Sequence, residues 1–336
     1  GVAVQIVTDD MPLLVESVTA LLGRLDASIS EVVHPILGVR RDADGMLEQI
    51  LADVPIRDLP TDALAESWMH VQLHPATEDE ILDELESSIA AVLSDVGQVV
   101  ADTDAMRGLQ LAVAAELDVR AENPPPGRSA DELRDCADLL RWLADGHYTV
   151  LGYRRYECGD DHRTRRIQES GLGVLRSEAH ADEHIRIPLT VDIPDRPLLV
   201  LTQGSAPATV HRSVYPYFVG VSILDDDGAI VGEHRFLGVF TVTAMHENVL
   251  EIPVIARRVR TAIERAGFGI DSFSGQAMLE VVQSFPRTEL FSIDADALLE
   301  TMTAVLNIGL RRQIRLFMRE DSFERFVSCL VYLPRD

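Results

Sequence analysis

The pattern of apolar and polar positions over the first hundred residues predicts strands and helices that alternate along the chain. The apolar run at residues 2–7 indicates a buried strand, and the periodicity of residues 14–25 is that of an amphipathic helix. Pro12 stands at the first turn of this helix, where its missing N–H costs nothing. Two strand candidates follow, at residues 31–40 and 46–54.

A turn, a further strand and a second helix complete this first module. Residues 42–45, Asp-Ala-Asp-Gly, are a hairpin signal between the two strand candidates. Residues 67–73 predict a fourth strand. Thr77 and Glu80 have the spacing of a capping box, and residues 81–92 continue with the apolar positions of the helix that it would start.

A connector separates this module from the next. Residues 98–121 look helical, and the Glu-Asn-Pro-Pro-Pro-Gly stretch at residues 122–127 is the clearest linker in the chain. Ser129 and Glu132 form a second capping box, and the helix after it is expected to end before Gly146.

Short strands separated by turns dominate the following hundred residues. They are predicted at residues 147–157, 163–168, 198–202, 218–224 and 229–242. This spacing suits an antiparallel sheet. Asp225-Asp226-Asp227-Gly228 lacks the spacing and the terminal glutamate of a calcium loop, so we interpret it as a hairpin turn.

The last part of the chain changes pattern again. Residues 252–286 are mainly helical, with Gly267 as a helix stop. Residues 289–293 predict a strand, and Asp294 is expected to cap the helix after it. Two further strand candidates follow, at residues 313–318 and 325–333. Because the chain begins in the same order, we expect a structural repeat whose second copy is truncated.

The charge balance excludes several classes of partner. Asp and Glu total 55 against 30 Lys and Arg, which gives a net charge of −25. Nucleic acids and anionic membranes would both repel such a chain, so neither is an expected partner. All the basic residues are arginines, which excludes a Schiff-base, P-loop or acid/base lysine from these residues.

The cysteines and the hydropathy predict a cytoplasmic location. Cys136, Cys158 and Cys329 form no C-x-x-C pair, and their odd number argues for a reducing compartment. Cys329 lies in an apolar strand and is interpreted as a core residue. No apolar stretch is long enough to span a membrane, and no signal peptide precedes the first strand. Both ends, at Gly1 and Asp336, adjoin a strand, so we expect a fragment.

Several short motifs match parts of known chemical sites without the structural context that those sites need. His180-Ala181-Asp182-Glu183-His184 matches H-x-x-E-H, but strand-like alternation and Pro188 follow at once, so we favour a polar loop over a zinc site. The pairs Gly171/Gly173 and Gly267/Gly269 lack the third glycine of a dinucleotide loop and are interpreted as turn glycines. His34, His147 and His246 are interpreted as structural. We therefore assign no catalytic and no metal-binding residue.

The loop between the first strand and the first helix is the strongest candidate for a binding site. Asp9, Asp10, Met11, Pro12 and Leu13 lie there, in front of a helix N-terminus. Backbone N–H groups and the positive end of the helix dipole suit a carboxylate ligand. Simple capping of the helix by Asp10 is the alternative.

This loop resembles the signature of ACT domains, in which strand one leads into D-x-P-G-L-L at the start of helix one. Asp10, Pro12 and Leu14 match the signature, and Leu13 replaces its glycine. In that family the loop often helps to form an amino-acid site between two ACT units. The missing glycine removes room for close approach of a ligand to the backbone.

A broader resemblance covers nearly the whole chain. Residues 4–12, the pair His34-Pro35, and residues 151–154, 171–176, 233–240, 289–291 and 325–336 are similar to the N-terminal region of the large bacterial NAD-specific glutamate dehydrogenases. The resemblance implies a parent enzyme that converts L-glutamate, NAD and water to 2-oxoglutarate, ammonia and NADH. It implies that NAD and the catalytic domain lie outside this chain, so no cofactor is expected here.

The resemblance also implies an α+β fold of ACT-like (ferredoxin-like) modules with antiparallel sheets. The expected organisation is an ACT-like module at 1–97, a helix and Pro-rich linker at 98–129, a PAS-like or second ACT-like β-rich module at 130–250, a helical connector at 251–288, and the first half of a further ACT-like module at 289–336. The first module's fourth strand precedes its second helix, so another module or chain would complete its sheet.

Two hypotheses of function follow. In the first, the chain is a non-catalytic regulatory and assembly segment that senses an effector such as an amino acid, alongside the rest of the parent chain and other subunits of a homo-oligomer. In the second, it is a purely structural oligomerisation scaffold that pairs exposed strand edges. A free-standing zinc hydrolase built on His180, Glu183 and His184 is a remote third interpretation.

Overall fold

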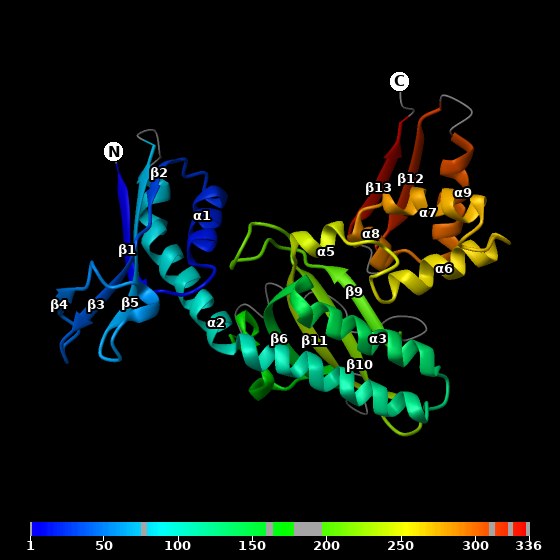
Figure 1. The fold of residues 1–336 in the computed structure, drawn as a ribbon, viewed down its shortest axis with the longest axis horizontal. Helices are drawn as coiled ribbons and strands as arrows, with labels where there is room; N and C mark the ends of the chain where they lie inside the picture. The colour runs from blue at the N-terminus through cyan, green and yellow to red at the C-terminus, as the bar shows by residue number, and fades with distance from the viewer. Residues whose placement is uncertain are drawn as a thin grey trace. The chain divides into compact units, whose positions relative to one another are not determined.

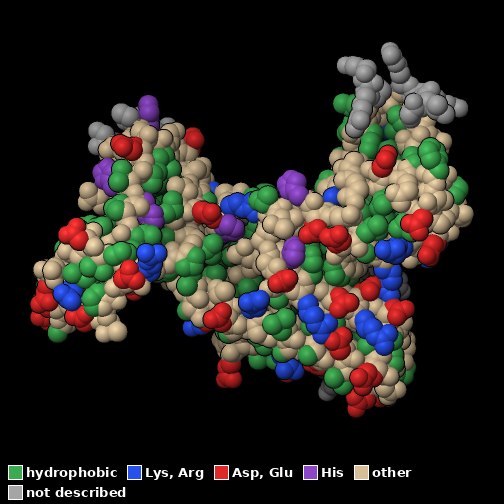
Figure 2. All heavy atoms as spheres, in the orientation of Figure 1, with side chains coloured by type: hydrophobic (Ala, Val, Ile, Leu, Met, Phe, Trp, Pro, Cys, Tyr) green, Lys and Arg blue, Asp and Glu red, His purple; other side chains and the backbone are tan. Residues whose placement is uncertain are grey.

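The computed structural model describes residues 2–74, 79–158, 164–177, 197–308, 313–321 and 325–333. The chain divides into two compact units (Figure 1). The first unit comprises Gly1–Asp102 together with Pro207–Val214, and the second comprises Thr103–Ala206 together with Tyr215–Asp336. Acidic side chains are scattered among arginines over the visible face, without gathering into one patch (Figure 2).

An antiparallel sheet built around one central strand forms the first unit. Its strands are β1 (Ala3–Asp9), β2 (Ile29–Val33), β3 (Ile36–Arg41), β4 (Leu47–Ile50) and β5 (Leu64–Leu73). Strand β5 pairs with β1 along one edge and with β2 and then β3 along the other, and β4 pairs with β3. The short helix η1 (Ile56–Asp58) lies between β4 and β5.

The predicted strand at residues 31–40 is wrong as a single element. It divides into β2 and β3 at His34 and Pro35. Proline has no N–H to give to the ladder. The Pro35 carbonyl nevertheless accepts a hydrogen bond of 3.0 Å from the Trp68 N–H. The predicted hairpin is confirmed, because Asp42 Oδ1 accepts the N–H groups of Asp44 and Met46.

Two helices cover one face of this sheet (Figure 1). They are α1 (Leu14–Arg24) and the first part of α2 (Asp79–Glu122). Alternate residues of the strands are buried against these helices, as the two-residue period of side chains along a strand requires. The core they form contains Ile6, Leu14, Val18, Leu21, Leu22, Met69, Val71, Leu85, Ile89, Val92 and Val96. The proposed capping box of α2 lies outside the described residues.

Helix α2 is one continuous element where the sequence predicted two. It runs for 44 residues, through the expected module boundary at residue 97. Gly97 and Gly108 lie inside it, and each faces open space, so neither marks a turn. The first part of the helix supplies buried residues to the first unit, and the part that contains Met106, Val113 and Leu117 supplies them to the second.

A segment distant in sequence completes the first unit. Residues 207–214, here named the strap, lie between two strands of the second unit in the sequence but belong to the first unit. Arg24 Nη1 donates to the Ala208 carbonyl at 3.0 Å, and Thr209 Oγ1 donates to Asp95 Oδ2 at 3.0 Å. The strap thereby contacts both α1 and α2.

The second unit contains the predicted antiparallel sheet. Its strands are β6 (Tyr148–Cys158), β7 (Thr164–Arg166), β8 (Leu172–Gly173), β9 (Leu199–Gln203), β10 (Tyr217–Leu224) and β11 (Ile230–Phe240). The order is β7-β6-β11-β10-β9, and β8 pairs with β6. The short helices η3 (Gln168–Ser170) and η4 (Val174–Arg176) flank β8.

Local signals at the borders of this sheet are confirmed. Ser129 Oγ accepts the Glu132 N–H at 3.1 Å and caps α3 (Ala130–Trp142), which leads into the π-helical turn η2 (Leu143–His147). Asp225 Oδ1 accepts the N–H groups of Asp227 and Ala229, which makes the predicted hairpin turn between β10 and β11.

Helices dominate the rest of the second unit. They are α5 (Val242–His246), α6 (Ile255–Arg265), α7 (Phe273–Gln283), α8 (Arg287–Ser292) and α9 (Ala295–Ile308), followed by the hairpin of β12 (Arg315–Glu320) and β13 (Val327–Tyr332). Gly267 has a φ of 82° and follows α6, which confirms the predicted stop. Asp294 Oδ1 accepts the N–H groups of Asp296 and Ala297 and caps α9, as predicted.

Two predictions for this region are wrong. Residues 289–293 are not a strand, because they lie in helix α8 and its C-cap. The Pro286 carbonyl accepts the N–H groups of Glu289 and Leu290, which begins a helix. The expected repeat of strand, helix and two strands therefore lacks its first strand. Cys329 is exposed on β13 rather than buried in a core.

A histidine of β11 gives the second unit a pH-dependent stability. His234 Nδ1 and the Tyr153 hydroxyl are hydrogen-bonded at 2.8 Å, and burial raises the pKa of this hydroxyl to about 12. Burial lowers the pKa of His234 from 6.5 to about 4. The unfolded chain therefore binds a proton near pH 6.5 that the native chain takes up only near pH 4, so stability falls as the pH falls through this window.

We predict that His234→Asn, which keeps an acceptor but cannot titrate, removes part of this pH dependence. Between pH 6.5 and 5, the wild-type free energy of unfolding should fall with a slope approaching about 1.4 kcal/mol per pH unit from this group alone. Urea unfolding of the variant and the wild type at several pH values measures the difference. Parallel pH profiles would show that the histidine is not the cause.

Candidate functional site

The predicted binding loop forms a tight connection between β1 and α1. Strand β1 ends at Asp9, which lies opposite Glu66 in the register with β5. The Asp10 N–H donates to the Ala65 carbonyl at 2.9 Å and ties the loop to the central strand. Asp9 and Pro12 are exposed, and Asp10 is half-buried.

Leu13 adopts the backbone conformation that favours glycine. Its φ is 71° and its ψ is −4°, in the left-handed region. A side chain in this region costs roughly 1–2 kcal/mol relative to the right-handed helical conformation. The Leu13 carbonyl accepts the N–H of Ser17 at 3.0 Å and its hydroxyl at 2.6 Å, and the adjacent Leu14 is buried. These contacts hold the strained turn in place.

Asp10 does not cap α1, so this alternative interpretation is wrong. Leu13 occupies the N-cap position, and no side chain hydrogen-bonds to the first turn from there. An aspartate three positions before the N-cap cannot take the usual capping geometry, in which the N-cap side chain itself reaches the second or third helical N–H. The first-turn amides of α1 are therefore left without a side-chain cap.

The strap lies on the same turn of α1. The His211 N–H donates to Ser17 Oγ at 2.8 Å, and His211 Nδ1 is hydrogen-bonded to Glu16. His211 also has a left-handed backbone, with a φ of 71°. Sequence reasoning missed this neighbour, because 194 residues separate His211 from Ser17 and no local pattern links them.

A buried carboxylate anchors the sheet beside the loop. Glu66 is 4% exposed, and both of its oxygens accept from Arg41, with Nη2 at 2.9 Å. The Trp68 indole N–H also donates to it at 3.0 Å. The hydrogen bond from Arg41 lowers the pKa of Glu66, aided by Trp68 and opposed by burial. This cluster was not predicted, because its members lie on different strands.

The second unit also buries charged groups in its sheet. Glu233 Oε1 accepts from Arg235 Nε at 2.7 Å, and both side chains are at most 2% exposed. The Arg235 guanidinium lies 5.0 Å from the centroid of the Tyr156 ring. Arg154 is fully buried and donates to the Leu175 carbonyl. The Glu233–Arg235 pair lies within β11, and Arg154 joins β6 to η4, so these buried charged groups have partners inside the unit.

The remaining sequence motifs have structural roles wherever they lie within the described residues. Gly173, interpreted from the sequence as a turn glycine, lies in β8 with a φ of 57°, and a Cβ there would meet the Leu151 carbonyl at 2.2 Å, so close packing requires the glycine. His147 stacks on Trp142 with ring centroids 4.2 Å apart, and its Nδ1 bonds to the Trp142 carbonyl. The H-x-x-E-H motif at residues 180–184 lies outside the described residues.

Two features are absent from the part of the chain that the structure describes. Among its residues, no three side chains of His, Cys, Asp or Glu are grouped so that they could hold a metal ion. None of the described helices combines the length and the apolar character that crossing a membrane requires.

Comparison with known sequence families defines the class of this chain. The family described as glutamate dehydrogenase, ACT1 domain, matches residues 2–89. Glutamate dehydrogenase, helical motif 1, matches residues 252–311, and glutamate dehydrogenase, ACT2 domain, matches residues 315–336. The chain is thus an ACT-domain segment of the glutamate dehydrogenase type, and the first ACT match covers the sheet and the candidate loop of the first unit.

Curated relatives narrow the family. The chain is 40% identical over its whole length to an NAD-specific glutamate dehydrogenase of Mycobacterium tuberculosis. It is 34% identical over 99% of its length to the enzymes of the same name from Halomonas elongata and Pseudomonas aeruginosa. Over its whole length the chain is therefore similar to one region of NAD-specific glutamate dehydrogenases. It spans only 20–21% of the length of these relatives.

The strain at Leu13 gives a testable consequence. Leu13→Gly and Leu13→Ala lose the same contacts beyond Cβ, but only glycine relieves the left-handed backbone. We predict that Leu13→Gly is more stable than Leu13→Ala by about 1 kcal/mol. Chemical unfolding of both variants measures the difference.

Thr19, in the middle of α1, supplies the matched control. There the order should reverse, with Thr19→Gly less stable than Thr19→Ala by about 1 kcal/mol. Equal stabilities of the two Leu13 variants would contradict the assignment of strain to this residue.

Proposed function

We propose that this chain is a non-catalytic regulatory and assembly segment of an NAD-specific glutamate dehydrogenase. The parent would convert L-glutamate, NAD and water to 2-oxoglutarate, ammonia and NADH in a domain outside this chain. A cytoplasmic homo-oligomer is the proposed setting, since an odd number of cysteines without a C-x-x-C pair suits a reducing compartment. The segment would sense a small molecule, such as an amino acid, at residues 9–13.

The uncapped start of α1 is the observation that supports effector binding. Its first-turn N–H groups have no side-chain cap and carry the positive end of the helix dipole, which suits a carboxylate. The carboxylates of Asp9 and Asp10 lie directly before the turn and could take an ammonium group. An amino-acid zwitterion offers both charges in one molecule.

The strap offers a route from this site to the rest of the chain. His211 and Ser17 are hydrogen-bonded at the first turn of α1, so a ligand there would meet the strap as well as the loop. Regulation would follow if the ligand bound one conformation of this turn more tightly than another.

We predict that a thermal-shift screen of the chain against amino acids, 2-oxoglutarate and nucleotides identifies an amino acid. Ligand at about 100 times its dissociation constant adds about 2.7 kcal/mol of stability. Asp10→Ala should abolish the shift, because it removes the partner of the ammonium group. Asp44→Ala, in the β3–β4 turn of the same unit, is the control and should retain it. A screen without any shift would count against sensing.

A second candidate function, the oligomerisation scaffold, rests on strand β2. Ile29, Val32 and Val33 are 37–46% exposed, and among the described residues β2 pairs only with β5. An open edge of this kind can pair with a strand of another subunit.

For the scaffold, we predict that Val32→Lys lowers the average mass measured by light scattering at high protein concentration. A charge on an edge strand disfavours edge-to-edge pairing. Met46→Lys, at an exposed position of the hairpin turn in the same unit, should leave the mass unchanged. A wild-type mass that equals one chain at every concentration would exclude pairing of the isolated chain through β2.

A further inference from the structure

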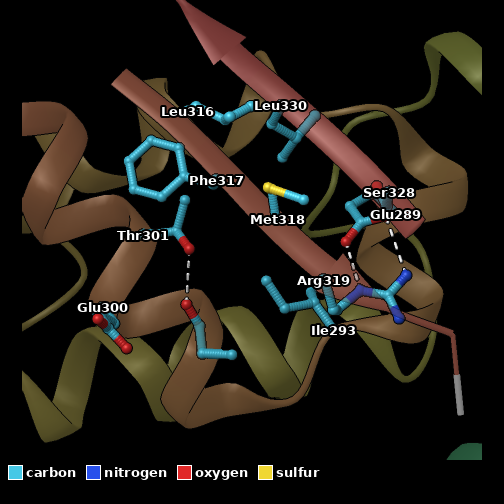
Figure 3. A pocket seen from close by; sticks show the side chains of 11 residues that line it. Glu289, Ile293, Glu300, Thr301, Leu316, Phe317, Met318, Arg319, Ser328 and Leu330 are labelled. Atoms are coloured by element: carbon cyan, nitrogen blue, oxygen red, sulfur yellow. Dashed lines mark hydrogen bonds and ion pairs between the residues drawn. The ribbon is translucent and has the colours of Figure 1, made fainter.

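A cavity of about 260 Å³ lies between helix α9 and the β12–β13 hairpin in the second unit (Figure 3). It is far from the loop at residues 9–13 in sequence and belongs to the other unit. A cavity of about 150 Å³ can hold benzene, and sites for drug-sized ligands begin near 300 Å³. The volume therefore suits one small metabolite and excludes a dinucleotide.

One end of the cavity carries a fixed guanidinium group. Arg319 Nε and Nη2 donate to the two oxygens of Glu289 at 2.6 and 3.0 Å, and Ser328 Oγ donates to Glu289 at 2.7 Å. Arg319 Nη1 donates to the Glu320 carbonyl at 3.2 Å. Among the described residues, these bonds use three of the five guanidinium N–H groups, which leaves two to bind a carboxylate.

Glu289 keeps this guanidinium in place at neutral pH. Burial by itself would raise the pKa of Glu289, but the hydrogen bonds from Arg319 and Ser328 outweigh it and lower the pKa. The carboxylate therefore stays ionised, and Arg319 stays oriented along β12. Arg319 is therefore a guanidinium fixed by an ion pair rather than a mobile surface arginine.

The other end of the cavity offers acceptors for a cation. Thr301 is buried, and its hydroxyl donates to the Ala297 carbonyl at 2.8 Å, so its oxygen can still accept a hydrogen bond. The exposed carboxylate of Glu300 lies beside it, on the side of the cavity away from Arg319 (Figure 3). The walls between the two ends include the apolar side chains of Ile293, Phe317 and Leu330.

The charges of the lining exclude most other ligands. Glu289, Glu300 and Arg319 sum to −1, which disfavours phosphates and dicarboxylates. A purely apolar molecule would leave the open N–H groups of Arg319 without partners, at a cost in free energy. A molecule that carries one anion, one cation and an apolar body satisfies every part of the lining.

We propose that this cavity is a second small-molecule site, which binds a zwitterionic amino acid with an apolar body. The ligand carboxylate accepts from Arg319, its ammonium group donates to Glu300 and Thr301, and its methylene or branched carbons contact Phe317 and Leu330. A bound ligand connects the hairpin to α9. The site is independent of the effector loop proposed above.

Isothermal titration of the whole chain tests the proposal with four probes. Leucine and 5-aminopentanoate carry both charges at different separations, 4-methylpentanoate lacks the ammonium group, and 3-methylbutylamine lacks the carboxylate. We predict that at least one of the two zwitterions binds, and that each single-charge probe binds at least tenfold more weakly than it. Charge-assisted hydrogen bonds of about 1.5–3 kcal/mol correspond to this factor. Failure of both zwitterions to bind would overturn the proposal.

Variants then assign the binding to this cavity. Glu300→Gln and Thr301→Val, which preserve shape, should each weaken the zwitterion about tenfold or more. Glu280→Gln, at an exposed position of α7, is the charge-matched control and should bind as the wild type does. Asp10→Ala should also bind normally. Loss of binding in Asp10→Ala with retention in Glu300→Gln would place the ligand at the α1 loop and overturn the cavity site.

Discussion

The apolar stripe of helix α2 is the constraint on which both units depend. Leu85, Ile89 and Val92 are buried in the first unit, and Val113 and Leu117 are buried in the second. Each such side chain contributes about 1.5–3 kcal/mol when it is fully buried. The two glycines inside the helix cost about 1 kcal/mol each relative to alanine. Burial therefore outweighs the local propensity, and the helix continues without a break.

Two residues with a left-handed backbone are held by hydrogen bonds at the start of α1. Leu13 and His211 both have left-handed backbones, and both hydrogen-bond to Ser17. A leucine rarely takes this conformation, so the surrounding contacts must hold Leu13 there. The two strained residues, far apart in sequence, are therefore held by the same serine of α1.

The sequence patterns correctly predicted the structural features that depend on residues close together along the chain. The turns at Asp42 and Asp225 and the cap at Ser129 follow from side-chain bonds within a few positions, and all were predicted. The stretch at residues 289–293 was assigned wrongly, because five residues of mixed character do not separate a helical from an extended period. The position of the strap could not be predicted from the sequence, for a different reason. Its contacts with Ser17 and Asp95 arise only when distant segments pack together.

The candidate site was predicted only in part, because some of its features also depend on contacts between segments that are distant in sequence. The loop at residues 9–13 stands out in the sequence, but its left-handed turn at a leucine does not, because leucine rarely takes that conformation. The Arg319–Glu289 pair joins a strand to a helix 30 residues away and belongs to no motif. Only the packing of α8 and α9 against the hairpin places both residues on one cavity.

The position of the strap has a consequence for synthesis on the ribosome. A chain that emerges from its N-terminus presents residues 1–102 first, yet Arg24, Ser17 and Asp95 must wait for partners at residues 208–211. Roughly a hundred more residues must be translated in between, which takes about 5–20 s at typical rates. During that interval the helices of the first unit lack part of their contacts. The nascent first unit is thus kept incomplete until strands β6 to β9 of the second unit have been made.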